Sequence, residues 1–279
     1  MSHDAPDRST PARPSDDPLA LKAKRRRGIY LLPNLFTTAG LFAGFYSILA
    51  AIAGDFGNAA IAIFVAMVMD GLDGRVARLT NTSSAFGMEY DSLTDMVAFG
   101  VAPGLVIYLW SLHSLGSWGS FGLKIGWLGA FVYTASTALR LARFNTQVDT
   151  ADKRYFQGLP SPAAAALVAG MVWFGNEFGF SGDELNVLAL IITVLAGVLM
   201  VSNVRYSSFK QVDLRGRIRF VHVLGVALAF GLIFLNPPLV IFGGFLVYVI
   251  SGPVLTLLWV RRHRAERLRG GAAEDEPTD

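Results

Sequence analysis

Four aspartates form two pairs within one stretch of the sequence, MDGLDGRVARLTNTSSAFGMEYDSLTDMVAFG, at positions 69–100. Asp70 and Asp73 are three positions apart, and Asp91 and Asp95 are four apart. On a helix these spacings place both members of a pair on one face. Carboxylate oxygens without nearby His or Cys suit hard cations, Mg²⁺ or Mn²⁺, with Ca²⁺ as a competitor. The pattern therefore predicts two divalent ions about 3.5–4 Å apart, a clamp suited to phosphoryl chemistry.

Two antiparallel helices joined by the short polar turn 80–86 would bring the two pairs face to face. Only residues 59–69 are purely apolar before Asp70, which at about 1.5 Å per residue spans about half of a roughly 30 Å bilayer core. Asp70 and Asp95 should therefore lie within membrane depth, where each buried carboxylate costs roughly 2.5–3.5 kcal/mol. Arg75 and Arg78 are too few to compensate for four clustered negative charges, whereas divalent cations would do so directly. Glu89 lies on the other face and is predicted to be solvated or capping.

The composition predicts an all-α, polytopic membrane protein, since apolar residues make up 53% and charged residues 16% of the 279-residue chain. The absence of Cys excludes disulfides and thiolate chemistry. No basic patch interleaved with aromatics indicates nucleic-acid binding. About eight transmembrane helices are expected, and the predicted spans are 32–53, 57–80, 88–111, 122–145, 160–177, 185–203, 218–235 and 238–260.

A single membrane domain is predicted over residues 21–263, preceded by a disordered tail at 1–20 and followed by a flexible tail at 264–279. Residues 21–27, LKAKRRR, form a basic juxtamembrane segment. Of the 24 Lys and Arg residues, all but Lys124 lie on the cytoplasmic side when the N-terminus is placed there. We therefore expect a protein of the cell (inner) membrane with both termini and the aspartates on the cytoplasmic side.

The aspartate stretch resembles the motif of the CDP-alcohol phosphotransferases. That motif is an Asp, two residues, Asp-Gly, two residues, Ala-Arg, eight residues, Gly, three residues, Asp, three residues and Asp. Every spacing is kept here, and the resemblance covers about residues 30–260. The matching positions are Asp70, Asp73, Gly74, Ala77, Arg78, Gly87, Asp91 and Asp95.

The resemblance implies a role for each of these residues. Asp70 and Asp91 would each contact both metals, Asp73 would bind one, and Asp95 would bind the other and act as general base. The remaining positions are implied to contact the CDP-lipid or leave room for it, with Pro33 and Thr38 beside them and Ser84 as a weaker candidate. This set is Asn34, Thr37, Gly74, Ala77, Arg78, Ser84 and Gly87.

Three further stretches resemble the phosphatidylserine synthases of bacteria and archaea: RLARFN at 140–145, YFQGLPSP at 155–162 and SNVRYSSFK at 202–210. The carboxylate of serine suits a bidentate Arg. Arg140, Arg143 and Arg205 could each supply it, although each could equally be a positive-inside anchor. The turn before 161 is also readable as simple helix punctuation.

The expected reaction is attack of the serine hydroxyl, deprotonated by Asp95, on the lipid-side phosphorus of CDP-diacylglycerol, with release of CMP. The cavity is expected between the first six helices, and the last two would serve packing or homodimer contacts. The same chemistry with glycerol 3-phosphate, inositol phosphate or choline is the alternative acceptor hypothesis. A divalent-cation transporter is the remote alternative, although its carboxylates would be expected on several helices near the midplane.

Overall fold

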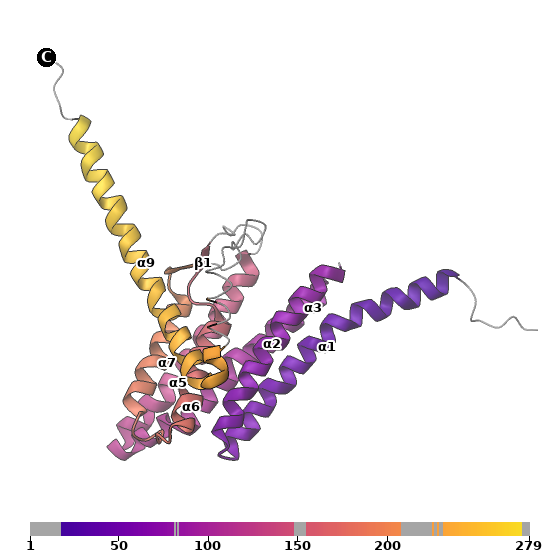
Figure 1. The fold of residues 1–279 in the computed structure, drawn as a ribbon, viewed down its shortest axis with the longest axis horizontal. Coiled ribbons are helices and arrows are strands. Elements are labelled where there is room, and N and C mark those ends of the chain that lie inside the picture. Colours follow the sequence, from indigo (N-terminus) through magenta and orange to yellow (C-terminus); the bar gives the residue numbers. More distant parts are fainter. Residues whose placement is uncertain are drawn as a thin grey trace, which may run out of the picture.

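The computed structural model describes residues 18–80, 82, 84–147, 155–207, 225, 228 and 231–274 of the chain, with described side chains beginning at Pro33. The part it describes is almost entirely helical (Figure 1). Its elements in chain order are α1 (Pro18–Ile52), α2 (Phe56–Thr80), α3 (Ala85–Asp95), the π-helical segment η1 (Met96–Val101), α4 (Ala102–Trp110), the 3₁₀ segment η2 (Leu112–Trp118), α5 (Ser120–Gln147), β1 (Tyr155–Gln157), α6 (Ser161–Glu177), α7 (Asn186–Val201), β2 (Arg205–Ser207) and α9 (Pro237–Glu274).

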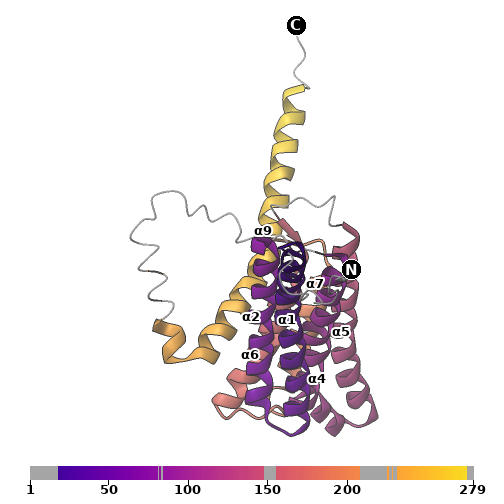
Figure 2. The same cartoon turned by 90° about the vertical axis from the view of Figure 1, so that its right-hand side faces the viewer.

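The helices from α1 to α7 run up and down in one bundle, with short connections between successive elements (Figures 1 and 2). The C-terminal ends of α2, α5 and α7 and the N-terminal ends of α3 and α6 therefore meet at one end of the bundle. The strands β1 and β2 lie at that same end. The N-terminal part of α1 and the C-terminal part of α9 project away from the bundle (Figure 1).

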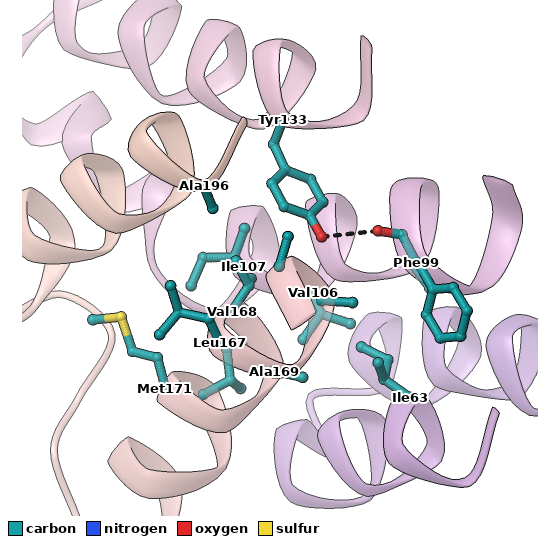
Figure 3. Packing of buried hydrophobic residues seen from close by; sticks show 14 of the residues in the cluster. Ile63, Phe99, Val106, Ile107, Tyr133, Leu167, Val168, Ala169, Met171 and Ala196 are labelled. Carbon is teal, nitrogen blue, oxygen red and sulfur yellow. Dashed lines mark hydrogen bonds between the residues drawn. The ribbon is translucent and has the colours of Figure 1, made fainter. Parts of the chain in front are cut away.

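Small residues allow the helices to approach closely in the core. Most of the first half of α6, an alanine-rich run at 163–169, is buried. A Cβ at Gly44 of α1 would lie 2.9 Å from the Cα of Ala98, so glycine permits the contact of α1 with η1. Ile63 of α2, Val106 of α4 and Val168 of α6 belong to the same buried core (Figure 3).

The π-helical segment η1 begins directly after Asp95, and it was not predicted from the sequence. Pro103 in the first turn of α4 has no N–H to offer the Phe99 carbonyl four residues earlier. The buried hydroxyl of Tyr133 on α5 donates to that carbonyl instead, at 2.8 Å (Figure 3). Thr134 donates to the Gly100 carbonyl at 3.3 Å. Side chains of α5 therefore satisfy two carbonyl groups of η1, those of Phe99 and Gly100.

Within the described residues, three helical stretches are long and apolar enough to cross a membrane: Pro33–Ile52, Ala85–Trp110 and Pro237–Leu258. This makes the chain a nearly all-helical membrane protein, but it does not confirm eight spans. Four further predicted spans coincide in position with the helices α2, α5, α6 and α7. Of these helices, α6 and α7 have 17 and 16 residues, and α2 carries four charges near its C-terminal end. The predicted span at 218–235 lies mostly outside the described residues.

Two local features were not predicted from the sequence. β1 pairs antiparallel with β2, Phe156 lying opposite Tyr206, although the described part of the chain is otherwise helical, in agreement with the predicted all-α fold. The C-terminal helix α9 continues to Glu274, through much of the segment predicted as a flexible tail from 264. Its sequence there, RAERLR, consists of good helix formers, which the acidic and glycine content of the tail obscured. The boundaries predicted for the membrane domain stay a prediction.

Candidate active site

Three of the four aspartates come together where α2 ends and α3 begins. One carboxylate oxygen from each of Asp70, Asp91 and Asp95 lies within 4.8 Å of the other two. All three side chains are partly buried. The polar turn between Thr80 and Ala85 reverses the chain, as predicted, so that the faces with spacings of three and four meet. Glu89 is exposed, as expected from its position on the other face.

The carboxylates are poorly satisfied by the protein itself. Asp91 Oδ1 and Asp95 Oδ1 are buried, and neither has a hydrogen-bond partner among the described residues. A buried anionic oxygen without a partner is costly, so natural sites neutralise it with a proton, a cation or a donor. Oxygen ligands at this separation suit a hard divalent cation. The residues present therefore fit the divalent metals that the sequence predicts.

Asp73 occupies a different environment from the other three. It is only 4% exposed and lies outside the group of three oxygens described above. Its Oδ2 accepts a hydrogen bond from Thr37 Oγ1 of α1 at 2.8 Å. Thr37, a predicted CDP-lipid contact, thus orients a predicted metal ligand. Thr37 Oγ1 also lies 3.1 Å from the carbonyl oxygen of Pro33, one turn earlier in α1. The backbone of α1 thus helps to fix the hydroxyl that donates to Asp73.

The mouth of the site is formed by α1 and the first turn of α3. Ser84 caps α3 by accepting a hydrogen bond from the Gly87 amide at 3.0 Å. A Cβ at Gly87 would lie 3.6 Å from Asn34 Oδ1, so the two predicted lipid-binding positions are neighbours. Thr38 Oγ1 lies 3.0 Å from the Tyr90 hydroxyl and links the same two helices. The capping role accounts for Ser84 without a ligand.

Two glycines of α2, Gly71 and Gly74, leave the backbone between and beside the aspartates Asp70 and Asp73 uncovered. A Cβ at Gly71 would have no atom within 4 Å, and one at Gly74 would approach only the Arg78 guanidinium, at 3.8 Å. Arg78 Nε donates to the Gly74 carbonyl at 2.8 Å, which holds this exposed cation beside the gap. Ala77, also partly exposed, lies between them in the sequence. This exposed backbone leaves room for a diphosphate, and contact of Gly74 and Arg78 with the CDP part stays a prediction.

The three arginines predicted to bind the acceptor differ in their surroundings. Arg140 on α5 interacts electrostatically with Asp95, donates to Ser161 Oγ at 2.7 Å, and has a buried Nε with no hydrogen-bond partner in the described part of the chain. Arg143 is instead engaged by Gln157 at 2.7 Å and Asn203 at 3.1 Å. The side chain of Arg205 lies outside the described residues. Of the two arginines whose side chains are described, Arg140 is therefore the one that interacts with an aspartate of the site.

The sequence GLPSP at 158–162 forms the turn that ends before α6 and the start of that helix, which agrees with its interpretation as a helix-start signal. Gly158 has a φ of 76°, a left-handed conformation that favours glycine, and its amide donates to the Val204 carbonyl at 2.9 Å. Pro160 precedes the first residue of α6. The turn nonetheless brings Ser161 within hydrogen-bond distance of Arg140, a contact that could not be predicted from this stretch of sequence.

Comparison with known proteins agrees with this geometry. The model of the family described as CDP-alcohol phosphatidyltransferase matches residues 30–206, which include every element of the site from α1 to β2. The chain belongs to this family. All four aspartates and their neighbouring glycines lie within the matched region, whereas α9 lies beyond it.

Relatives named CDP-diacylglycerol–serine O-phosphatidyltransferase occur in bacteria and archaea. The protein of Helicobacter pylori is 42% identical over 202 residues, covering 72% of this chain and 82% of the relative. That of Mycobacterium leprae is 30% identical over 249 residues, covering 87% and 80%. That of Methanocaldococcus jannaschii is 29% identical over 207 residues, covering 74% and 86%.

Proposed function

We propose that this family member transfers the phosphatidyl group of CDP-diacylglycerol to the hydroxyl of L-serine, giving phosphatidylserine and CMP. The observation that carries the proposal is the group of three carboxylates with two unpartnered buried oxygens, set in the motif of a CDP-alcohol phosphatidyltransferase. The names of the relatives favour serine as the acceptor. Phospholipid biosynthesis is the process that such a reaction serves.

The aspartates would hold two divalent cations, Mg²⁺ or Mn²⁺. Asp70 and Asp91 would contact both ions, Asp73 one and Asp95 the other. Bound there, the ions would neutralise the charge that builds on the diphosphate as the phosphorus–oxygen bond breaks. Thr37 fixes Asp73 by its hydrogen bond, so α1 contributes to the geometry of the ligands. Asn34, Gly74, Ala77, Arg78 and Gly87 would contact the CDP-lipid or leave room for it, and Ser84, which caps α3, is the weaker candidate.

The chemical step is one displacement. Asp95 accepts the proton of the serine hydroxyl, whose oxygen forms a bond to the lipid-side phosphorus of CDP-diacylglycerol. The bond from that phosphorus to the bridging oxygen breaks, and CMP leaves with the electron pair. Arg140, next to Asp95, offers its buried Nε and neighbouring N–H groups to the serine carboxylate. This arrangement would place the nucleophile beside its base.

The acceptor is the part of the proposal that an experiment must decide. Purified protein is given CDP-diacylglycerol with serine, glycerol 3-phosphate, inositol phosphate or choline, and CMP release is measured for each. We expect release with serine to exceed that with every other alcohol. A phosphorylated acceptor would require a further basic cluster near Asp95. Faster release with glycerol 3-phosphate or inositol phosphate would contradict serine as the substrate.

We further propose eight membrane spans in the cell inner membrane, with both termini and the active site on the cytoplasmic side. The asymmetry of Lys and Arg supports this orientation. The chain has no Cys, so single cysteines report topology directly. Cysteines at Ser117 and Ser181 should react with an impermeant thiol reagent in intact cells, and cysteines at Ser83 and Ser207 only after lysis. Labelling of Ser83→Cys in intact cells would contradict the orientation.

A further inference from the structure

The C-terminal helix α9 is joined closely to the end of the bundle that contains the active site. It packs against α6, where a Cβ at Gly170 would lie 3.3 Å from the Cα of Phe242. It also packs against β2, where Gly252 accommodates the ring of Tyr206 and a Cβ would overlap that ring. The helix lies beyond residues 30–206, so the family match says nothing about what it does.

Tyr206 fixes the position of α9 along its axis. Its side chain is only 1% exposed, and its hydroxyl donates to the Val249 carbonyl of α9 at 3.1 Å. Burial raises the pKa of Tyr206 to about 12, so the phenol keeps the proton that it donates. The ring of Tyr206 lies 5.5 Å from that of Tyr248, centroid to centroid. Tyr248 is thus held between β2 and the core.

Tyr248 connects α9 to the site through Arg140. Arg140 interacts electrostatically with both Asp95 and Tyr248, and one of its terminal nitrogens donates a hydrogen bond to Ser161 Oγ at 2.7 Å. A guanidinium fork recognises a carboxylate only in a fixed plane and direction. Ser161 holds one arm of this fork, and the phenol of Tyr248 is a second polar group that interacts with it.

We propose that Tyr248 is a positioning residue for the acceptor alcohol, orienting the Arg140 guanidinium so that its unpartnered buried Nε faces the acceptor's carboxylate. The inference rests on the proposed function. It makes α9 a wall of the acceptor side of the site, rather than an element that serves only packing or dimer contacts. The ligand chemistry is an amino alcohol with a carboxylate.

The test compares Tyr248→Phe with Tyr206→Phe, two identical changes on neighbouring rings. For each, kcat and KM are measured with serine and with serinamide, which keeps the hydroxyl and ammonium but lacks the carboxylate. In Tyr248→Phe the KM for serine should rise about tenfold, the typical effect of misaligning one charge-assisted contact. The KM for CDP-diacylglycerol should stay within about twofold, and the preference for serine over serinamide should fall about tenfold.

Tyr206→Phe should lower the melting temperature, because it loses the bond to Val249, yet keep the serine preference of the wild type. An unchanged serine preference in Tyr248→Phe would overturn the inference, as would equal losses with both acceptors. If Tyr248→Phe does not fold, Tyr248→His, which keeps a ring and a polar atom, must retain more serine preference than Tyr248→Leu, and the opposite order overturns the inference. Absence of serine-dependent CMP release by the wild type would overturn the proposed function itself and this inference with it.

Discussion

The acidic side of the site, on α2 and α3, and the basic side, on α5 and α6, draw their residues from the chain in different ways. The four aspartates lie within residues 70–95, on two helices joined by a short turn. On the other side, Arg140 meets Ser161 across a loop, and Arg143 meets Asn203 from beyond α7. The comparison teaches that metal ligation can be encoded locally, whereas recognition of the acceptor depends on the tertiary fold.

The two sides also differ in how far the protein satisfies them. Asp91 and Asp95 each keep a buried oxygen without a hydrogen-bond partner in the described part of the chain, so under the proposed function the acidic side would depend on cations. One terminal nitrogen of Arg143 donates to both Gln157 and Asn203, as a scaffold residue would, while the buried Nε of Arg140 has no hydrogen-bond partner among the described residues. Loss of metal should therefore abolish activity, whereas changes on the basic side should alter acceptor affinity.

Metal removal should have the largest effect. Excess chelator should stop CMP release completely, because the clustered carboxylates would then repel the diphosphate. Added Mn²⁺ or Mg²⁺ should restore the activity, whereas Zn²⁺ alone should not, since no His or Cys lies among the predicted ligands. Release of CMP is followed against free metal concentration. Undiminished turnover in excess chelator would refute the two-metal hypothesis.

Substitutions of Arg140 and Arg143 should distinguish a residue that binds the acceptor from one that stabilises the fold. Arg140→Lys keeps the charge but loses the planar fork, so the KM for serine should rise about tenfold or more. Arg143→Lys loses contacts to Gln157 and Asn203, so its melting temperature should fall while the KM for serine changes less than about threefold. Steady-state kinetics and thermal unfolding in detergent measure both. The reverse pattern would assign the acceptor to Arg143.

A smaller effect is expected where α1 supports the acidic side. Thr37→Val removes the donor to Asp73 and leaves a buried carboxylate oxygen unsatisfied, at a cost of about 1–3 kcal/mol. The Mn²⁺ concentration for half-maximal activity should rise about tenfold. Thr193→Val on α7 is the matched control, because the buried Thr193 hydroxyl has no hydrogen-bond partner in the described structure and lies on another helix. Equal effects of both variants on the Mn²⁺ requirement would contradict the role of Thr37 in positioning Asp73.

The sequence predicts the acidic side well because its information is short in range. Helical spacing and one polar turn suffice to bring Asp70 to Asp91 and Asp95, and a hydropathy pattern suffices to place the helices. The basic side could not be predicted because no local rule pairs Arg140 with Ser161. The π-helical segment η1 likewise follows from a tertiary bond of Tyr133, and the pairing of β1 with β2 joins segments far apart in the chain.

The central claim is that the acidic side both holds the metals and supplies the base, and two variants separate these roles. Asp95→Asn keeps the size and one oxygen of the side chain but loses the basicity. It should bind nucleotide with modest loss yet lose turnover by roughly 10²–10⁴-fold. Asp70→Asn should lose metal and nucleotide affinity together, because the diphosphate is held mainly through the ions.

The decisive measurement is calorimetry of CDP binding beside CMP release for the wild type, Asp95→Asn and Asp70→Asn, all at one Mn²⁺ concentration. We predict retained binding with lost turnover for Asp95→Asn, and loss of both for Asp70→Asn. Near-wild-type turnover by Asp95→Asn would contradict its assignment as the base. Normal CDP binding by Asp70→Asn would contradict the claim that the carboxylates of α2 and α3 hold the nucleotide through metal ions.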